Sequence, residues 1–246
     1  MAETSGIRAV TFDIGYTLLF PRESVGEGCA RAAADVGVQV DPVRAEALFL
    51  DAWFAAQKTH RGLVFGTDNE SGKRFWRMVL ELAMAEFGLA EERIARLTDV
   101  LYEWFGRPDV WRVNPAWPEV RDGLRRRGIR LGTVSNWDIR LGEILRTLGI
   151  FNEFDAVIVS AEHGLEKPDA ALFRKAWTAL GVRPDEMLHV GDSWHDDVCG
   201  ASSAGMRAVW LNASGAACPA PDAPHRQIRY LAELPAVVQE PPAVPL

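Results

Sequence analysis

Five short and nearly continuous apolar runs constrain the fold of this chain more than any other feature of its sequence. They lie at residues 8–14, 129–136, 155–160, 187–192 and 207–212. Continuous hydrophobicity, rather than alternation, is typical of parallel strands that helices cover on both faces. Helical patterns that end on or near glycine separate the last four runs, at residues 138–149, 171–181 and 197–205. This alternation predicts an α/β fold with right-handed crossovers.

The segment between the first two runs is too long for a single crossover connection. Residues 21–113 carry apolar side chains at three- and four-residue spacing, for example Phe75, Val79 and Leu82, which predicts about four amphipathic helices. We therefore expect a core domain made of residues 1–20 and 114–234, with a Rossmann-like parallel sheet of about five strands in the order 3-2-1-4-5. Residues 21–113 would form an inserted helical cap domain. The Pro-rich residues 235–246 are expected to be a disordered tail.

Composition and charge exclude several classes of protein. Apolar residues make up 48% of the 246 residues, enough for a sizeable core. The net charge of -7 argues against nucleic-acid and anionic-membrane partners, which require a basic patch. No apolar run approaches the ~18 residues of a membrane-spanning helix. The three scattered cysteines show no metal-binding spacing and fit a reduced, cytoplasmic compartment. No feature of the sequence addresses the oligomeric state.

Polar residues follow the predicted strands at the points where each strand ends. Asp13 to Thr17 follow the first run, Ser135 and Asn136 end the second, Lys167 lies in the loop after the third, and Asp192 and Asp197 follow the fourth. Ligands of open α/β sheets bind outside the carboxyl ends of the strands. Each of these residues alone is more often a helix cap or a loop residue. Together they predict a catalytic site. His189, inside the fourth run, is predicted to be a core residue.

The four motifs, in this order, resemble those of the haloacid dehalogenase-like superfamily, most of whose members are phosphatases with an aspartyl nucleophile. The family's Asp-x-Asp-x-Thr motif corresponds to DIGYT, its Ser- or Thr-ending strand to TVSN, its lysine motif to EKPDAALF, and its Gly-Asp-Ser-x-x-x-Asp motif to GDSWHDDVCGASSAG. The motif arrangement and the inserted cap are most similar to the subgroup of the fly rhythmically expressed gene 2 product.

The resemblance implies a role for each motif residue in a Mg²⁺-dependent hydrolase that acts on a small phosphorylated metabolite. Asp13 would be the nucleophile that forms an aspartyl-phosphate, and Lys167 would offset the repulsion between this carboxylate and the phosphate. The phosphate would be bound by Thr17, Ser135, Asn136 and Lys167. The Mg²⁺ ion would be held by Asp13, the carbonyl of Gly15 and Asp192, with Asp197 nearby through water.

Gly15 stands where family phosphatases carry a second Asp, which protonates the leaving group. General acid–base catalysis contributes about 10²–10⁴-fold, so three interpretations stay open. The first is a phosphatase specialised for acyl or aryl phosphates, the second a catalytically degenerate protein that binds a ligand or partner, and the third a 2-haloacid dehalogenase. Family dehalogenases carry a motif similar to Ser-Ser-Asn where this chain has Gly-Asp-Ser, which favours the first two. The loop at residues 57–66 is a candidate for reaching the pocket, and a solvated connector is an equal alternative.

Overall fold

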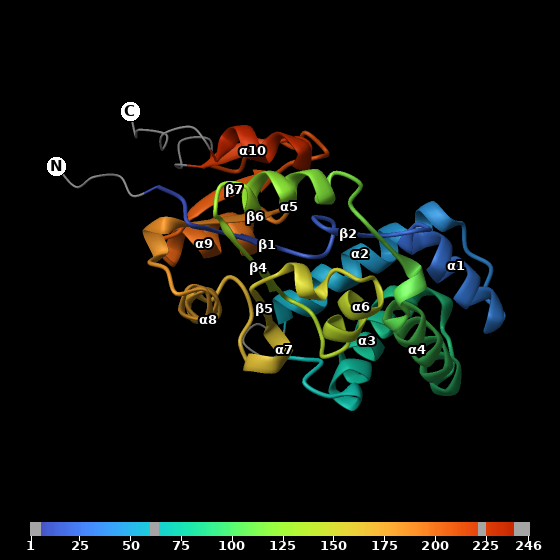
Figure 1. Ribbon diagram of the computed structural model, residues 1–246. Coiled ribbons are helices and arrows are strands. Elements are labelled where there is room, and N and C mark those ends of the chain that lie inside the picture. The colour runs from blue at the N-terminus through green and yellow to red at the C-terminus, as the bar shows by residue number, and fades with distance from the viewer. Residues whose placement is uncertain (1–5, 60–63, 221–224, 239–246) are drawn as a thin grey trace. The chain divides into compact units, whose positions relative to one another are not determined.

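The computed structural model describes residues 6–59, 64–220 and 225–238 (Figure 1). The chain divides into two compact units. The α/β unit consists of Met1–Phe20, Val113–Asn136 and Leu148–Leu246, and the helical unit consists of Pro21–Arg112 and Trp137–Thr147. Residues 137–147, which the sequence pattern assigns to the α/β domain, group with the helical unit. No helix in the described ranges is both long and apolar enough to cross a membrane.

A six-stranded parallel sheet forms the centre of the α/β unit. Its strands are β1 (Ala9–Phe12), β4 (Arg130–Ser135), β5 (Ala156–Val159), β6 (Met187–Gly191), β7 (Arg207–Leu211) and β8 (Arg226–Ile228). The order β5-β4-β1-β6-β7-β8 confirms the α/β class and the predicted order of the first five strands. The edge strand β8 has no apolar run that predicts it, because it is only 3 residues long and two of these are polar. A second sheet pairs β2 (Leu19–Pro21) with β3 (Trp111–Val113).

Helices cover both faces of the six-stranded sheet (Figure 1). On one face lie α5 (Trp117–Arg125) and α10 (Leu234–Val237), where the Trp117 ring packs edge-on against Phe12 of β1 at 5.2 Å between centroids. The other face carries α8 (Ala170–Leu180) and α9 (Gly200–Ser203), and Phe173 of α8 belongs to its hydrophobic cluster. The sequence predicts a disordered tail from residue 235, but residues 235–237 belong to α10. Residues 239–246 of the predicted tail lie outside the described residues.

The register between β1 and β6 decides which side chains meet at the carboxyl edge of the sheet. Thr11 of β1 pairs with His189 of β6, one residue before the Phe12–Val190 pair. Because side chains alternate along a strand, Thr11 and Asp13 point to the same face. Asp13 and Asp192, which follow the neighbouring strands β1 and β6, therefore lie side by side.

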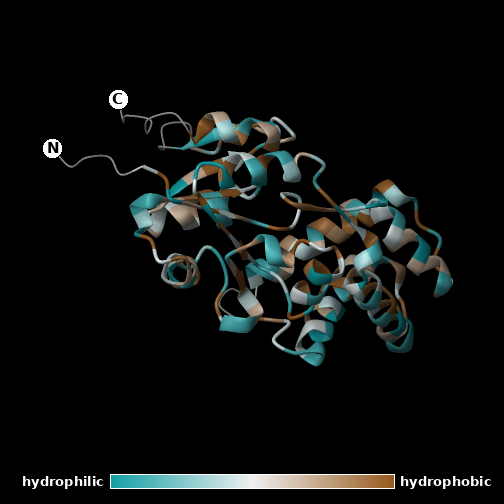
Figure 2. Cartoon of the chain, viewed as in Figure 1, coloured by the Kyte–Doolittle hydropathy of each residue, from teal (hydrophilic) through white to brown (hydrophobic). Residues whose placement is uncertain are grey.

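In its described residues, the helical unit contains four long α-helices and one short one. They are α1 (Val25–Asp35), α2 (Pro42–Thr59), α3 (Asn69–Ala83), α4 (Glu91–Gly106) and α6 (Leu141–Thr147). Ser24 caps α1 in a capping box with Glu27, and Asp68 caps α3. Apolar and polar residues both occur along these helices (Figure 2), and the rings of Trp76 and Phe105 meet at 4.8 Å between centroids in the unit's own core.

Short helical elements complete the described part of the chain. The remaining α-helix is α7 (Ser160–His163), and the single turns are η1 (Ala85–Phe87), η2 (Pro108–Val110), η3 (Phe151–Glu153), η4 (Pro184–Glu186), η5 (Trp194–Cys199) and η6 (Leu231–Glu233). Of these, η5 is a π-helical turn that follows β6. The helix predicted at residues 197–205 is therefore a π-turn continued by α9.

Candidate active site

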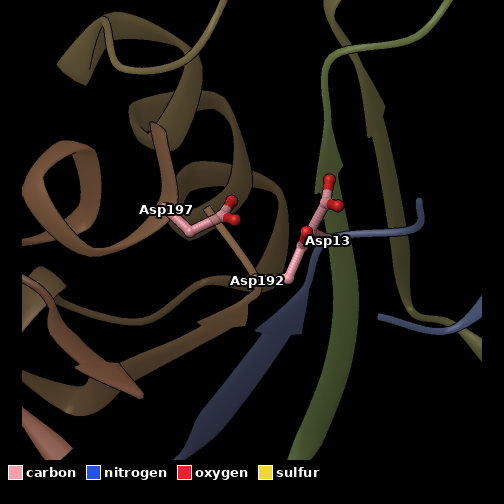
Figure 3. Close-up of side chains that lie close together, drawn as sticks. All are labelled: Asp13, Asp192 and Asp197. Carbon is pink, nitrogen blue, oxygen red and sulfur yellow. The ribbon is translucent and has the colours of Figure 1, made fainter. Parts of the chain in front are cut away.

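Three carboxylates meet at the carboxyl edge of the sheet. Asp13 follows β1, Asp192 follows β6, and Asp197 approaches from η5 (Figure 3). One oxygen from each carboxylate lies within 4.8 Å of the others. Hard oxygen ligands at this spacing are suited to a divalent cation. The parallel register of β1 and β6 is what brings Asp13 and Asp192 together.

Lys167 places a buried ammonium group between two of these carboxylates. Its Nζ atom lies 2.6 Å from Oδ1 of Asp13 and 2.6 Å from Oδ1 of Asp197, and the side chain is 3% exposed. Burial alone would lower the pKa of Lys167, but Asp13 and Asp197 outweigh it and raise the pKa above its ordinary value. The ammonium is therefore charged at neutral pH. The Lys167–Pro168 peptide bond is cis.

The end of β4 positions both Asp13 and the loop that carries Lys167. Ser135 Oγ donates a hydrogen bond of 2.9 Å to Asp13 Oδ1. The side chain of Asn136 donates to the carbonyl of Lys167 at 3.0 Å and accepts from its backbone N–H at 2.7 Å. These two bonds fix the backbone of Lys167. Thr17 is fully buried, and its hydroxyl makes a long contact of 3.4 Å with Asp192 Oδ1.

Both oxygens of Asp197 are engaged by protein donors. Oδ1 accepts from Lys167 Nζ and from His189 Nε2, which lies at 3.0 Å, while Oδ2 accepts from the backbone N–H of Ser193 at 2.9 Å. Burial favours the protonated form, but Lys167 and His189 outweigh it and hold the pKa of Asp197 below its usual range. Asp197 is thus an ionised group whose two oxygens both already accept hydrogen bonds from the protein.

Asp13 and Asp192 show the opposite behaviour. Burial raises the pKa of Asp13 despite its contact with Lys167. The carboxyl of Asp192 is crowded by protein atoms, although much of the residue's surface is exposed; this burial, together with Asp13 and Asp197, raises the pKa of Asp192 to about 8. Three carboxylates paired with one ammonium leave a net charge of -2 when all are ionised. In that fully ionised form the site carries negative charge that its own residues leave uncompensated.

Two buried polar residues join this site although no motif marks them. His189 is fully buried, as predicted for a core residue, but both of its ring nitrogens make polar contacts. Nε2 contacts Asp197, and Nδ1 lies 3.0 Å from Thr11 Oγ1. The sequence held one signal for them. Thr11 and His189 are polar residues in otherwise apolar runs; Thr11 precedes Asp13 by two residues, and His189 precedes Asp192 by three.

The turn after β1 offers no side-chain acid at position 15. The carbonyl of Ile14 accepts hydrogen bonds from Leu18 and Leu19, which closes the turn directly behind Asp13. Tyr16 has a φ of 52°, the left-handed region that residues other than glycine rarely adopt, and its residue surface is 46% exposed. The carboxylate that family phosphatases carry two residues after the nucleophile is replaced here by the bare backbone of Gly15.

A parallel α/β sheet with an aspartate–lysine cluster at its carboxyl edge and an inserted helical unit defines a hydrolase of the Rossmann-like class. The family model described as haloacid dehalogenase-like hydrolase matches residues 7–205, and the chain belongs to this family. This confirms the resemblance drawn from the four motifs.

Relatives with similar sequences support the same assignment. The chain is 33% identical over 216 residues to haloacid dehalogenase-like hydrolase domain-containing protein 3 of Mus musculus, covering 87% of this chain and 85% of that protein. It is 29% identical to glyceraldehyde 3-phosphate phosphatase of Methanothermobacter thermautotrophicus (84% and 86% covered). It is 27% identical to the rhythmically expressed gene 2 protein of Drosophila melanogaster (86% and 85% covered). The last match is consistent with the predicted subgroup.

Solved structures of both phosphatases and dehalogenases are similar to this chain. A haloacid dehalogenase-like phosphatase from Thermococcus onnurineus superposes with a TM-score of 0.66 at 25% identity, covering 95% of this chain and 98% of that one. A 2-haloacid dehalogenase from Pseudomonas syringae superposes with a TM-score of 0.63 at 26% identity, covering 94% and 98%. The overall fold therefore does not separate the two activities, and the site residues must do so.

Proposed function

We propose that the chain is a Mg²⁺-dependent phosphatase that hydrolyses a small phosphorylated metabolite through an aspartyl-phosphate on Asp13. The observation that carries this proposal is the cluster of Asp13, Asp192 and Asp197 around a single bonded ammonium, that of Lys167. Such a cluster repels an anionic haloacid unless a cation joins it. The phosphatase names of relatives such as the archaeal protein agree with the proposal at the level of the family.

The donor set fits Mg²⁺ and assigns different tasks to the three carboxylates. Asp13, the carbonyl of Gly15 and Asp192 would hold the ion, which prefers oxygen ligands and keeps several waters. Asp197 would act through water, because its oxygens already accept hydrogen bonds from Lys167, His189 and Ser193. When bound, Mg²⁺ supplies positive charge that stabilises the charge developing on the transferred phosphoryl group. The raised pKa values of Asp13 and Asp192 are those expected of ligands that lack their cation.

The chain's own residues perform the bond-making steps. A carboxylate oxygen of Asp13 attacks phosphorus, the bond to the leaving-group oxygen breaks, and that oxygen leaves with the electron pair. Lys167 and Ser135 hold Asp13 in place for this attack. Thr17, Ser135, Lys167 and the backbone N–H groups of the turn would bind the phosphate oxygens. Water then attacks the phosphorus of the aspartyl-phosphate, which releases inorganic phosphate and regenerates Asp13.

Gly15 sets the kind of ester that this site can cleave. The leaving-group oxygen receives no proton from position 15. General acid catalysis is worth about 10²–10⁴-fold, and its loss matters least when the leaving group is a weak base. We therefore propose acyl or aryl phosphates, rather than alkyl phosphates, as the substrates with the highest turnover.

Gly15 also favours a second candidate function, a catalytically degenerate member that binds a phosphorylated ligand or partner without turnover. Dehalogenation ranks third. A halide leaving group needs no proton, but this chain carries Gly-Asp-Ser, with Asp192, where family dehalogenases have a motif similar to Ser-Ser-Asn.

A substrate screen with matched metal conditions tests the proposal. Phosphate release is measured across acyl, aryl and sugar phosphates, each with Mg²⁺ and with EDTA, for the natural chain and for Asp13→Asn. We expect Mg²⁺-dependent release that Asp13→Asn abolishes. Ligand-induced stabilisation without release would support the binding function. Halide release from 2-haloacids in EDTA would support the third function.

A further inference from the structure

A chain of buried hydrogen bonds runs from the middle of the sheet to the proposed nucleophile. Thr11 Oγ1 lies 3.0 Å from His189 Nδ1, and His189 Nε2 lies 3.0 Å from Asp197 Oδ1. That oxygen accepts from Lys167 Nζ at 2.6 Å, and the same Nζ donates to Asp13 at 2.6 Å. Thr11 and His189 are both fully buried, and the side chain of Lys167 is 3% exposed. Solvent therefore does not compete for these contacts.

The hydrogen bonds from Thr11 to Asp197 can be ordered from donor to acceptor. An ionised carboxylate only accepts hydrogen bonds, so His189 must carry its hydrogen on Nε2 to bond Asp197. When the imidazole is neutral, its Nδ1 is then an acceptor, and the hydroxyl of Thr11 donates to it. A neutral imidazole satisfies both contacts at once. Each partner thus defines the orientation of the next, from Thr11 to Asp197.

The packing around His189 leaves space for this arrangement and for little else. A side chain on Gly191, which points to the same face two residues later, would place its Cβ 2.1 Å from the carboxyl carbon of Asp197. The ring of Phe173 packs edge-on against the imidazole at 5.1 Å between centroids. An apolar side chain at position 189 would fill the same core without bonding Asp197, and the neighbouring positions Leu188 and Val190 are indeed apolar.

We propose that His189 is a positioning residue that fixes the carboxylate of Asp197 and, through it, the ammonium of Lys167 against Asp13. This inference rests on the proposed phosphatase function for its kinetic consequence, but its geometric consequence is independent of turnover. Without the Nε2–H bond, Asp197 Oδ1 keeps only Lys167 as its donor, and the carboxylate can turn about its remaining bond to the backbone of Ser193. Of the two carboxylates that hold the Lys167 ammonium, one is then no longer fixed in place.

Four single variants separate positioning from packing. His189→Leu removes both polar contacts, and His189→Gln keeps an N–H donor that can reach Asp197. Thr11→Val removes only the hydrogen bond between Thr11 and His189, the one farthest from Asp13. Thr133→Val is the matched control, because Thr133 is an equally buried threonine on the adjacent strand β4 whose hydroxyl has no hydrogen-bond partner within the described residues.

Turnover and lysine accessibility are measured for each variant. The first readout is kcat and KM for an aryl phosphate with saturating Mg²⁺. The second is the rate at which acetic anhydride acetylates Lys167 in the metal-free protein, followed by peptide mass spectrometry, which needs no activity. We expect His189→Leu to lower kcat by about tenfold to a hundredfold, the worth of a hydrogen bond to a charged group. KM should change little, and acetylation of Lys167 should become several-fold faster.

The remaining variants make the inference falsifiable. His189→Gln should restore most of both readouts, Thr11→Val should show a smaller change in the same direction, and Thr133→Val should match the natural chain. Adding His189→Leu to Asp197→Asn should cost little beyond Asp197→Asn alone, because both act through one carboxylate. Equal losses in His189→Leu and His189→Gln, or natural acetylation in a folded His189→Leu, would overturn the inference. If His189→Leu does not fold, the two threonine variants decide. The inference is then overturned if Lys167 is acetylated at the natural rate in Thr11→Val and faster than that in Thr133→Val.

Failure of the proposed function gives a different result. If the natural chain hydrolyses no phosphate under any condition, the phosphatase assignment is wrong. The acetylation of Lys167 still decides whether His189 positions it.

Discussion

Lys167 and Asp13 are 154 residues apart in the sequence, yet Lys167 Nζ lies 2.6 Å from Asp13 Oδ1 in a site that excludes most solvent. The same ammonium is shared with Asp197. A buried charge of this kind is tolerated only when it is paired and hydrogen-bonded. The pair therefore ties the local stability of the site to the chemistry proposed for it.

Replacement of Lys167 by methionine should damage both stability and activity. The variant leaves Asp13 and Asp197 without their cation, and breaking a buried pair costs about 3–5 kcal/mol. We expect a clear loss in the free energy of unfolding, measured by urea denaturation, and a large loss of turnover. Lys175→Met is the control, because Lys175 is an exposed lysine on α8. A Lys167→Met chain as stable as the control would mean that the pair contributes nothing.

Replacement of Asp13 by asparagine should remove turnover and leave the fold intact. The amide has the size of the carboxylate but is a much weaker nucleophile, so we expect phosphatase activity to fall by more than about 10³-fold. Circular dichroism checks the fold, and Asp109→Asn, at an exposed aspartate of the helical unit, serves as the control. Retention of natural turnover on every substrate would exclude covalent catalysis at Asp13.

The pKa of Asp192 predicts how pH acts on the metal-free protein. Its carboxyl has a pKa of about 8 in the folded chain and an ordinary value of 3.8, so the folded state holds a proton that the unfolded state has lost. The contribution of Asp192 to the free energy of unfolding is therefore fully present below pH ~4 and is lost as the pH rises toward 8. The melting temperature in EDTA should therefore fall across this range. In Asp192→Asn, which cannot titrate, the fall should be smaller.

Mg²⁺ should reverse that trend. Metal binding requires ionised Asp192, so Mg²⁺ should bind more tightly, and raise the melting temperature more, at pH 8 than at pH 6. Calorimetric titration at both pH values measures this directly. Equal affinity at the two values would exclude Asp192 as a ligand that must lose a proton, and no binding at either would revive the dehalogenase interpretation.

The strand ends of the site could be predicted from the sequence because each chemistry-bearing residue terminates an apolar run. Asp13, Ser135 and Asp192 are of this kind, and the parallel topology then places them together. The links between them could not be predicted in this way. The contact of His189 with Thr11 depends on the register of β1 and β6, and the two bonds from Asn136 to the backbone of Lys167 depend on a loop conformation. No local pattern encodes either.

The boundary of the helical unit could not be predicted from the sequence either. Residues 137–147 follow β4 directly, so their position in the sequence suggests the α/β domain. In the structure Ile139 donates a backbone hydrogen bond to Gly66, and Arg140 lies over the ring of Tyr102 at 3.5 Å from its centroid. Gly66 has a φ of 78°, and a Cβ there would lie 2.3 Å from Cβ of Asp138. These are long-range contacts that helical periodicity does not report.

The helical unit is proposed to act as a cap that selects the substrate, with residues 57–66 as the first candidate segment. The structure corrects the expectation of a loop at its start, because residues 57–59 are the last residues of α2. Residues 60–63 of this segment lie outside the described residues. Replacing Lys58, His60 and Arg61 together by alanine should alter KM among substrates and leave the affinity for Mg²⁺ unchanged, because the proposed metal ligands all lie in the α/β unit. Kinetics on a panel of phosphates test this. Unchanged KM values throughout would identify the segment as a plain connector.

Gly15 gives the sharpest test of the proposed chemistry. If the natural site lacks only a general acid, Gly15→Asp should raise turnover of alkyl phosphates more than that of aryl phosphates, because basic leaving groups depend on protonation. The gain is bounded by about 10²–10⁴-fold, and the neighbouring Tyr16, already at a positive φ, is expected to keep it lower. Gly15→Asn is the control of equal size without an acid. In the natural chain, rates should fall steeply as leaving-group pKa rises. A flat dependence would mean that another group already donates the proton, and an equal gain in Gly15→Asn would rule out acid catalysis as its cause.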